Sequence, residues 1–185
     1  MFTVFDTETT GLDPLTGDRI VEIAGVKVQA DTIIDSFTSL VDPERPVSPA
    51  ARSVHGISDE ELHQAPPLQE VLPRFLSFSA GTRLCSYNAP FDLSFLKVSL
   101  GRIGQPVVST EAVDVLRMAR RLIPGIPSYA LGNVARHLGL EHSRLHRALA
   151  DVHLTWQVFR RLTPVLKQQA INDMETFSTL FAVRC

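Results

Sequence analysis

Val4-Phe5-Asp6-Thr7-Glu8-Thr9-Thr10-Gly11 carries the chain from an apolar run into two acids, one residue apart, just before a glycine. Such a run of β-branched and aromatic residues predicts a short buried strand that ends in a turn. Because alternate residues of a strand share a face, Asp6 and Glu8 should project into one small volume. Carboxylates held that close raise each other's pKa unless a cation lies between them, and a hard divalent cation prefers oxygen ligands. The stretch therefore predicts a divalent-metal site, provided that other acids converge on it.

Two other interpretations of the acid pair compete with the metal site. Acids flank strands and turns often, so the pair also suits a solvated turn. Asp6, Glu8, Thr10 and Gly11 occupy the first, third, fifth and sixth positions of an EF-hand calcium loop. The calcium loop fails because Gly17 stands at the twelfth position, where a bidentate Glu is required. Acids or a base elsewhere in the chain must decide between the other two.

Length and composition favour one globular domain without a membrane segment. The 185 residues are 44% hydrophobic, which is enough for one well-formed core. The net charge of −2 excludes a basic coat for non-specific duplex binding, so metal ions must supply much of the positive charge if the substrate is nucleic acid. Two cysteines give neither a disulfide framework nor zinc spacing, which suits a reducing cytoplasm. No apolar run is long enough to span a membrane, and the acid pair begins too early to leave room for a cleavable leader.

Periodicity and turn residues predict alternating strands and helices. Strands are expected at 2–5, 19–28, 32–41, 82–87 and 106–110. Helices are expected after Ser58, at 67–76, at 89–101, at 114–122, from Ser128 to 138, and along 147–162. Pro43, Pro46 and Pro49 predict an extended crossing segment, which places His55 in a loop before the helix that Ser58 caps.

Two later segments carry acids that can join Asp6 and Glu8. Asn88-Ala89-Pro90-Phe91-Asp92 is typical of a strand passing into a helix, with Asn88 as the N-cap and Asp92 in the first turn, where the helix dipole favours a carboxylate. Acids in first turns are also commonly structural. His146 and Asp151 open the last long helix five residues apart, so both face one cavity only if His146 lies in the preceding loop or first turn.

Together these motifs resemble the DnaQ-like (DEDDh) 3′-to-5′ exonuclease family. Asp-x-Glu-Thr-Thr-Gly, the Val-His-Gly-Ile of residues 54–57, Asn-x-x-Phe-Asp and His-x-x-x-x-Asp follow one another in order from Phe2 to about Lys167. Within the family, the chain looks most like the proofreading epsilon subunit of bacterial DNA polymerase III. It departs from many of those proteins at Tyr87, where they have a histidine, which puts the local contact to the cleaved phosphate or base in doubt.

The resemblance implies an RNase H-like α/β fold over residues 1–167. Its mixed central sheet combines an antiparallel meander of the first three strands with parallel strands, and helices flank it. The resemblance also implies two divalent metal ions, Mg²⁺ or Mn²⁺, about 4 Å apart. Asp6 would bridge both ions, Glu8 and Asp151 would complete the first site, and Asp92 would serve the second.

The remaining roles come from the same resemblance. His146 would be the general base, since an imidazole takes up a proton near neutral pH. The alternative is that His146 only packs against the rim of the site. Backbone groups of Thr9, Thr10 and Gly11 would bind the 3′-hydroxyl of the terminal nucleotide, and Leu12 would wedge beside its base. The lining residues would be His55, Asn88 and Phe91.

The expected substrate is a single-stranded or frayed 3′ end of DNA, with nucleoside 5′-monophosphates as products, in proofreading or DNA repair. An RNA-trimming exonuclease of the same family is the alternative, because the motifs are shared. An inactive exonuclease fold that serves as a binding module is the alternative of a different class.

The tail at 168–185 carries an apolar stripe at helical spacing. The stripe consists of Ile171, Met174, Phe177, Leu180 and Phe181. Packing back on the domain is the expected use, and docking to a DNA polymerase subunit is the alternative.

Overall fold

A mixed six-stranded sheet forms the centre of the computed structural model, which describes residues 1–106, 111–141, 146–168, 171 and 173–184. The strand order is β3-β2-β1-β4-β5-β6. The first three strands form an antiparallel meander, β4 and β5 run parallel to β1, and β6 returns antiparallel to β5. The strands are β1 (Phe2–Thr9), β2 (Ile20–Gln29), β3 (Thr32–Leu40), β4 (Arg83–Ser86), β5 (Glu111–Asp114) and β6 (Ala182–Arg184). The predicted fold class is confirmed.

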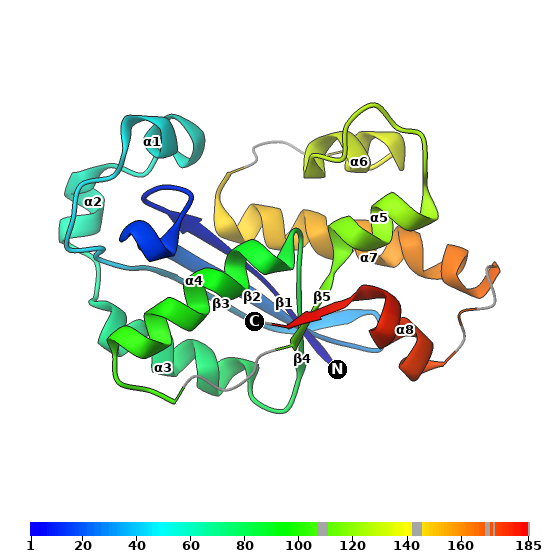
Figure 1. Ribbon diagram of the computed structural model, residues 1–185, viewed down its shortest axis with the longest axis horizontal. Coiled ribbons are helices and arrows are strands. Elements are labelled where there is room, and N and C mark those ends of the chain that lie inside the picture. The colour runs from blue at the N-terminus through cyan, green and yellow to red at the C-terminus, as the bar shows by residue number, and fades with distance from the viewer. Residues whose placement is uncertain (107–110, 142–145, 169–170, 172, 185) are drawn as a thin grey trace.

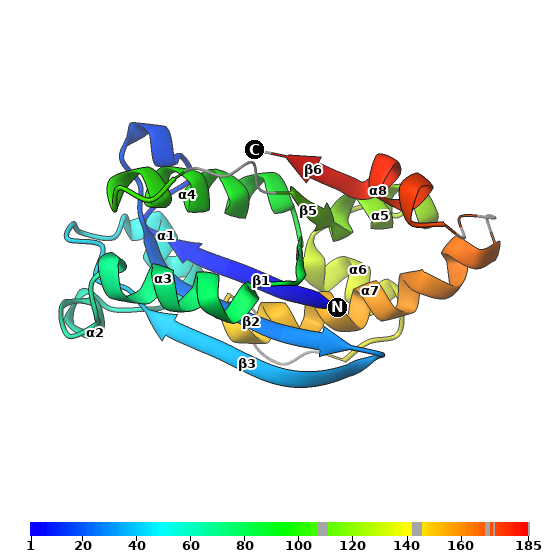
Figure 2. The same ribbon diagram turned by 90° about the horizontal axis from the view of Figure 1, so that it is seen from below.

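Helices cover both faces of this sheet. They are α1 (Pro49–His55), α2 (Asp59–His63), α3 (Leu68–Ser79), α4 (Ala89–Arg102), α5 (Val115–Leu122), α6 (Leu131–His137), α7 (Ala148–Gln168) and α8 (Met174–Phe181). Figure 1 shows α6 and α7 on one side of the sheet and α3 on the other, with α1 and α2 at one end. Figure 2 shows the first part of α7 beside β1 and β2, and its C-terminal turns extending past the N-terminal end of β1.

The alternation of β1 decides which face the acids enter. Val4 belongs to the apolar core that β1 and β2 share with α5, α6, α7 and α8. Phe5 belongs to the core on the other face and lies 5.7 Å, centroid to centroid, from the ring of Phe75 in α3. Because Asp6 and Glu8 follow the parity of Val4, they emerge toward α7.

The expected extended segment is wrong at its end, because a helix begins at Pro49. Ser48 caps α1 by accepting a hydrogen bond from the Ala51 N–H, and Pro49 suits the first helical position. His55 is therefore the last residue of α1, with only 2% of its surface exposed, and not a loop residue. Gly56 ends the helix with a φ of 71°, which glycine adopts without strain.

The other helices begin close to the predicted residues, but not every predicted N-cap side chain makes a capping hydrogen bond. Ser58 and Glu61 form the predicted capping box of α2. Asn88 precedes α4 as expected, but its backbone is left-handed and its side chain makes no capping hydrogen bond. The helix expected from Ser128 begins at Leu131, with Ala130 at the N-cap. The strand expected at 106–110 falls mostly on 107–110, outside the described residues, and β5 begins at Glu111.

The C-terminal segment packs against the domain as expected from its apolar stripe. Phe177 and Phe181 of α8 are buried in the core that also contains Phe159 of α7, while Met174 is 51% exposed. The three residues of β6 then pair with β5. Within the described ranges, no helix combines the length and the apolar character needed to cross a membrane.

Candidate active site

Asp6, Glu8 and Asp151 bring their carboxylates together although 143 residues separate the last two in sequence. One carboxylate oxygen from each lies within 4.8 Å of the other two, which is close enough to bind one cation. Asp6 and Glu8 come from the end of β1, and Asp151 comes from the first turn of α7. The strand parity and the position of α7 therefore build the cluster that the sequence only suggested.

Asp92 lies beside this cluster and is held by donors from two strands. Its Oδ1 accepts hydrogen bonds from the Thr7 N–H at 3.0 Å and from the Thr7 hydroxyl at 2.7 Å. Its Oδ2 accepts one from the Ser86 hydroxyl at 2.6 Å. Because β1 and β4 are parallel, the start of α4 meets the carboxyl end of β1 and delivers Asp92 there. A carboxylate has about four lone-pair sites, so three donors leave room for a further contact.

The electrostatics of the cluster favour the neutral acids. Burial, followed by repulsion from Asp92, Glu8 and Asp151, raises the pKa of Asp6 well above its ordinary value. Burial and the charge of Asp151 raise the pKa of Glu8 from 4.5 to about 8. The pKa of Asp92 is raised to about 6 by burial, against the lowering effect of the hydrogen bonds from Ser86 and Thr7. A cation among these groups would reverse this preference, because it favours the ionised carboxylates.

Glu22 is a fifth acid of the site that the sequence interpretation missed. It lies on β2 directly opposite Glu8 and is 4% exposed. Both of its oxygens are bound by Arg147, through Nε at 3.1 Å and an Nη at 2.8 Å, and the Ala148 N–H donates to it at 2.9 Å. The available signal was an acid inside the apolar run Ile20-Val21-Glu22-Ile23, since a charge in a buried strand requires a partner.

His146 lies just before α7, at the position that allows it to face the same site as Asp151. Its backbone N–H donates to Asp151 Oδ2 at 3.0 Å, and its φ of 65° is left-handed. The side chain is exposed to solvent. Such a φ is uncommon outside glycine and persists where surrounding contacts enforce it. The five-residue spacing is thus accommodated by a turn rather than by a regular helix.

A pocket of about 300 Å³ adjoins the acids and gathers most of the predicted nucleotide contacts. Its lining includes Glu8, Thr9, Gly11, Leu12, His55 and Phe91, and α1 supplies Ala50, Ala51 and Val54. Leu12 lines this pocket and is 84% exposed. The surface beside the carboxylates is therefore apolar and suited to a base or a sugar.

His55 enters the pocket from the end of α1 in its neutral form. Burial is the main cause that lowers its pKa from the ordinary value. Its Nδ1 accepts a hydrogen bond from the Ile57 N–H at 3.0 Å, so the proton of the neutral ring is assigned to Nε2. His55 is thus placed as a neutral donor near the end of β1.

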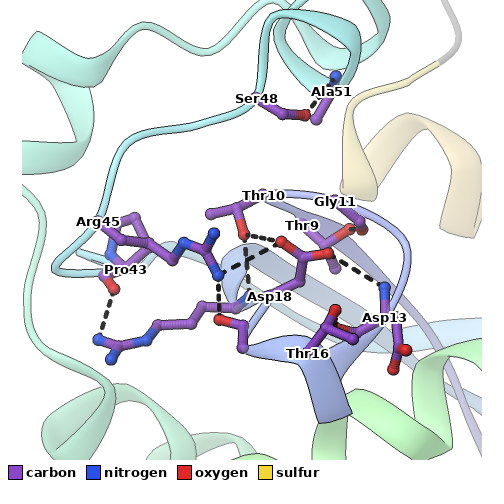
Figure 3. A network of polar contacts seen from close by, with 12 residues as sticks. Thr9, Thr10, Gly11, Asp13, Thr16, Asp18, Pro43, Arg45, Ser48 and Ala51 are labelled. Atoms are coloured by element: carbon purple, nitrogen blue, oxygen red, sulfur yellow. Dashed lines mark hydrogen bonds and ion pairs between the residues drawn. The ribbon is translucent and has the colours of Figure 1, made fainter.

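The loop that carries Leu12 is tied down by Asp18. Figure 3 shows the Asp18 carboxylate between Thr10, Asp13 and Arg45. It accepts from the Thr10 hydroxyl at 3.0 Å and from the Asp13 N–H at 3.1 Å, and an Arg45 Nη lies 3.5 Å from it. A Cβ on Gly11 would collide with the same carboxylate, so a larger residue here would displace Asp18 from this position.

Two of the expected nucleotide contacts are not part of the pocket. Thr10 is 1% exposed, and its hydroxyl is used by Asp18 and by the Arg19 N–H. Asn88 is exposed and does not line the pocket, and its backbone N–H donates to Asp114 at 3.2 Å. Thr10 thus holds the loop through Asp18, and Asn88 precedes the first residue of α4.

The family model RNase_T, described as an exonuclease, matches residues 3–159. The chain belongs to this exonuclease family. The resemblance to DnaQ-like exonucleases is thereby confirmed, and the chain has the corresponding hydrolase fold. The assignments of individual site residues stay predictions, which the geometry above motivates.

Curated relatives of this exonuclease family member include PolC-type DNA polymerases III and a DNA polymerase III subunit epsilon-like protein. The chain is 33% identical over 183 residues to the PolC-type DNA polymerase III of Caldanaerobacter subterraneus subsp. tengcongensis, covering 99% of this chain and 13% of the relative. It is 37% identical over 176 residues to a DNA polymerase III subunit epsilon-like protein of Rhodobacter capsulatus, covering 92% of this chain and 25% of the relative. The chain thus spans a quarter or less of the length of these relatives.

Solved structures share the fold over almost the whole exonuclease chain. Exonuclease X in complex with 5′ overhanging duplex DNA matches with a TM-score of 0.74 at 28% identity, covering 97% of this chain and 99% of that one. E. coli Exonuclease I in complex with a dT13 oligonucleotide matches with a TM-score of 0.81 at 22% identity, covering 92% of this chain and 42% of that one. The latter similarity shows the fold alone.

Proposed function

We propose that this chain is a divalent-metal-dependent 3′-to-5′ exonuclease that hydrolyses phosphodiester bonds at DNA 3′ ends and releases nucleoside 5′-monophosphates. One observation carries the proposal: three carboxylate oxygens within 4.8 Å of one another lie beside an apolar pocket of about 300 Å³. Polymerase III relatives and the DNA in the Exonuclease X structure support DNA as the substrate class, in proofreading or repair. A DNA polymerase subunit is the partner that these relatives suggest.

The donor set fits hard divalent cations. Asp6, Glu8 and Asp151 offer oxygens only, which suits Mg²⁺ or Mn²⁺, and Asp92 adds a carboxylate beside them. Two such ions supply charge stabilisation to the attacking and leaving oxygens of a phosphoryl transfer. The raised pKa values of Asp6 and Glu8 are the expected property of acids placed to receive a cation.

The protein groups have separate tasks in this reaction. Leu12 and Phe91 bound the pocket that takes the terminal base, and Thr9 and His55 present polar groups at the end of β1. The His146 imidazole, reachable from solvent, removes the proton from the attacking water. The hydrogen bond from the His146 backbone N–H to Asp151 fixes the distance between His146 and the acids.

The test is degradation of 3′-labelled oligonucleotides, presented as single-stranded, mismatched and paired DNA and as matched RNA, with Mg²⁺, Mn²⁺ or a chelator. We expect stepwise release of nucleoside 5′-monophosphates from single-stranded and mismatched DNA, abolished by the chelator. Internal cleavage, or metal-independent activity, would contradict the mechanism. Faster degradation of RNA than of DNA would identify RNA, and not DNA, as the preferred substrate.

A further inference from the structure

The ion pair of Glu22 and Arg147 stands out among those of the described residues because one partner is buried and the contact is a two-pronged fork. The Glu22 side chain is 5% exposed and that of Arg147 is 42% exposed. Both carboxylate oxygens are engaged, and the Ala148 N–H adds a third donor. Forked contacts between arginine and a carboxylate fix orientation as well as charge.

The residues on either side of Arg147 show what this fork orients. His146 precedes it and donates its backbone N–H to Asp151. Ala148 follows it and donates its backbone N–H to Glu22. The turn of residues 146–148 is therefore fastened at one end to an acid of the proposed metal site and at the other end to β2. Its left-handed residue, His146, is itself the first of these two attachments.

We propose that Glu22 and Arg147 are positioning residues for the nuclease reaction, which fix the turn at 146–148 so that His146 and Asp151 keep their places beside Asp6 and Glu8. The inference rests on the proposed function. It also separates Glu22 from the metal-binding acids, since its oxygens already serve Arg147 and Ala148. Glu22 acts through the turn and touches neither substrate nor reacting water.

The competing role for Arg147 is direct contact with a substrate phosphate, because part of its guanidinium reaches solvent. The two roles differ in what they change. Loss of a phosphate contact raises KM and leaves the turn unchanged. Loss of a positioning contact lowers kcat and loosens the turn even without substrate.

The experiment compares Arg147→Met and Arg147→Lys with the matched control Arg160→Met. Arg160 lies on α7, which begins one residue after Arg147, its side chain is 49% exposed, and it pairs with Asp31 at 3.4 Å. We expect Arg147→Met to lower kcat by about 10-fold to 100-fold with KM within about threefold of the parent. Arg147→Lys should recover only part of this loss, because an ammonium cannot bridge both oxygens in a plane. Arg160→Met should match the parent protein.

A second readout needs no activity. In metal-free protein, residue-resolved amide exchange should be about tenfold faster at His146 and Ala148 in Arg147→Met than in Arg160→Met. The double variant Glu22→Gln/Arg147→Met removes the unpaired buried charge and so protects folding. It should keep the loss in kcat, because the fork is still absent.

Three results would overturn the inference. The first is unchanged kcat and unchanged amide exchange in Arg147→Met. The second is a rise in KM alone, which would make Arg147 a substrate contact. The third is recovery of kcat in the double variant, which would show that the unpaired Glu22 charge caused the loss of kcat in Arg147→Met. If the parent protein degrades no nucleic acid, the proposed function fails, while amide exchange still tests whether the pair holds the turn.

Discussion

Replacing Glu8 by glutamine should stabilise the metal-free protein at neutral and alkaline pH while removing its activity. Burial and the charges of Asp151 and Glu22 raise the pKa of Glu8 from 4.5 to about 8. The folded state therefore binds a proton that the unfolded state releases. The free energy of unfolding is highest below about pH 4.5, and it falls as pH rises toward 8, where the folded acid ionises.

The size of the effect follows from the difference in pKa. A difference of about 3.5 at about 1.4 kcal/mol per unit gives an upper bound of roughly 5 kcal/mol at pH above 8. Neighbouring acids respond to one another, so neutralising one lowers the pKa of the rest and reduces the gain. We expect a net stabilisation of about 1–3 kcal/mol, which in a chain of this size raises Tm by about 2–4 °C per kcal/mol.

The assay is thermal unfolding of the parent and of Glu8→Gln in chelator, at about pH 5 and about pH 8. The difference in Tm should be small at the lower pH, large at the higher pH, and reversed or reduced when Mn²⁺ is added, because the parent gains more from the cation. Asp31→Asn, at an exposed acid on the β2–β3 turn, is the control and should show no such pH dependence. An equal or lower Tm for Glu8→Gln at the higher pH would refute the account of the site as a cluster of repelling, buried carboxylates.

Three further variants test the base, the wedge and the C-terminal helix. His146→Ala should lower kcat by about 10²-fold to 10⁴-fold with little change in metal affinity, and an unchanged kcat would remove His146 from the mechanism. Leu12→Ala should raise KM more than it lowers kcat and leave Tm unchanged, because the side chain is 84% exposed; a fall in Tm would mean that it packs within the protein. Phe181→Ala should cost about 3–5 kcal/mol of unfolding free energy, since the ring is fully buried, and unchanged stability would show that the tail is not part of the domain.

The sequence predicted the elements whose signals are local. The period of two in β1 placed Asp6 and Glu8 on one face, and the capping box located α2 to within a residue. Asp92 was placed in the first turn of its helix on N-terminal signals alone. These predictions succeed because each depends on neighbours within about one turn of the chain.

Two features were missed for different reasons, because the start of α1 had a local signal among the prolines whereas the place of Glu22 depends on a contact across the sheet. Three prolines indicated an extended segment, yet Ser48 and Pro49 together begin a helix that buries His55. Glu22 was read as one residue of a strand, because only the register of β1 with β2 places it opposite Glu8.

The acids of this candidate site fall into two groups according to how their charge is compensated. Glu22 is neutralised permanently by Arg147, and Asp92 is stabilised by hydroxyl and amide donors, so both keep their places without a cation. At Asp6 and Glu8, burial and the neighbouring acids outweigh any compensating charge, and their raised pKa values are the result. A built-in cation beside these two would stabilise the fold but would occupy the oxygens that a metal ion needs. Among the described residues, the forked Arg147 contact thus goes to Glu22, the acid that we propose orients the turn, and the charges of Asp6 and Glu8 are left for the proposed metal ion to neutralise.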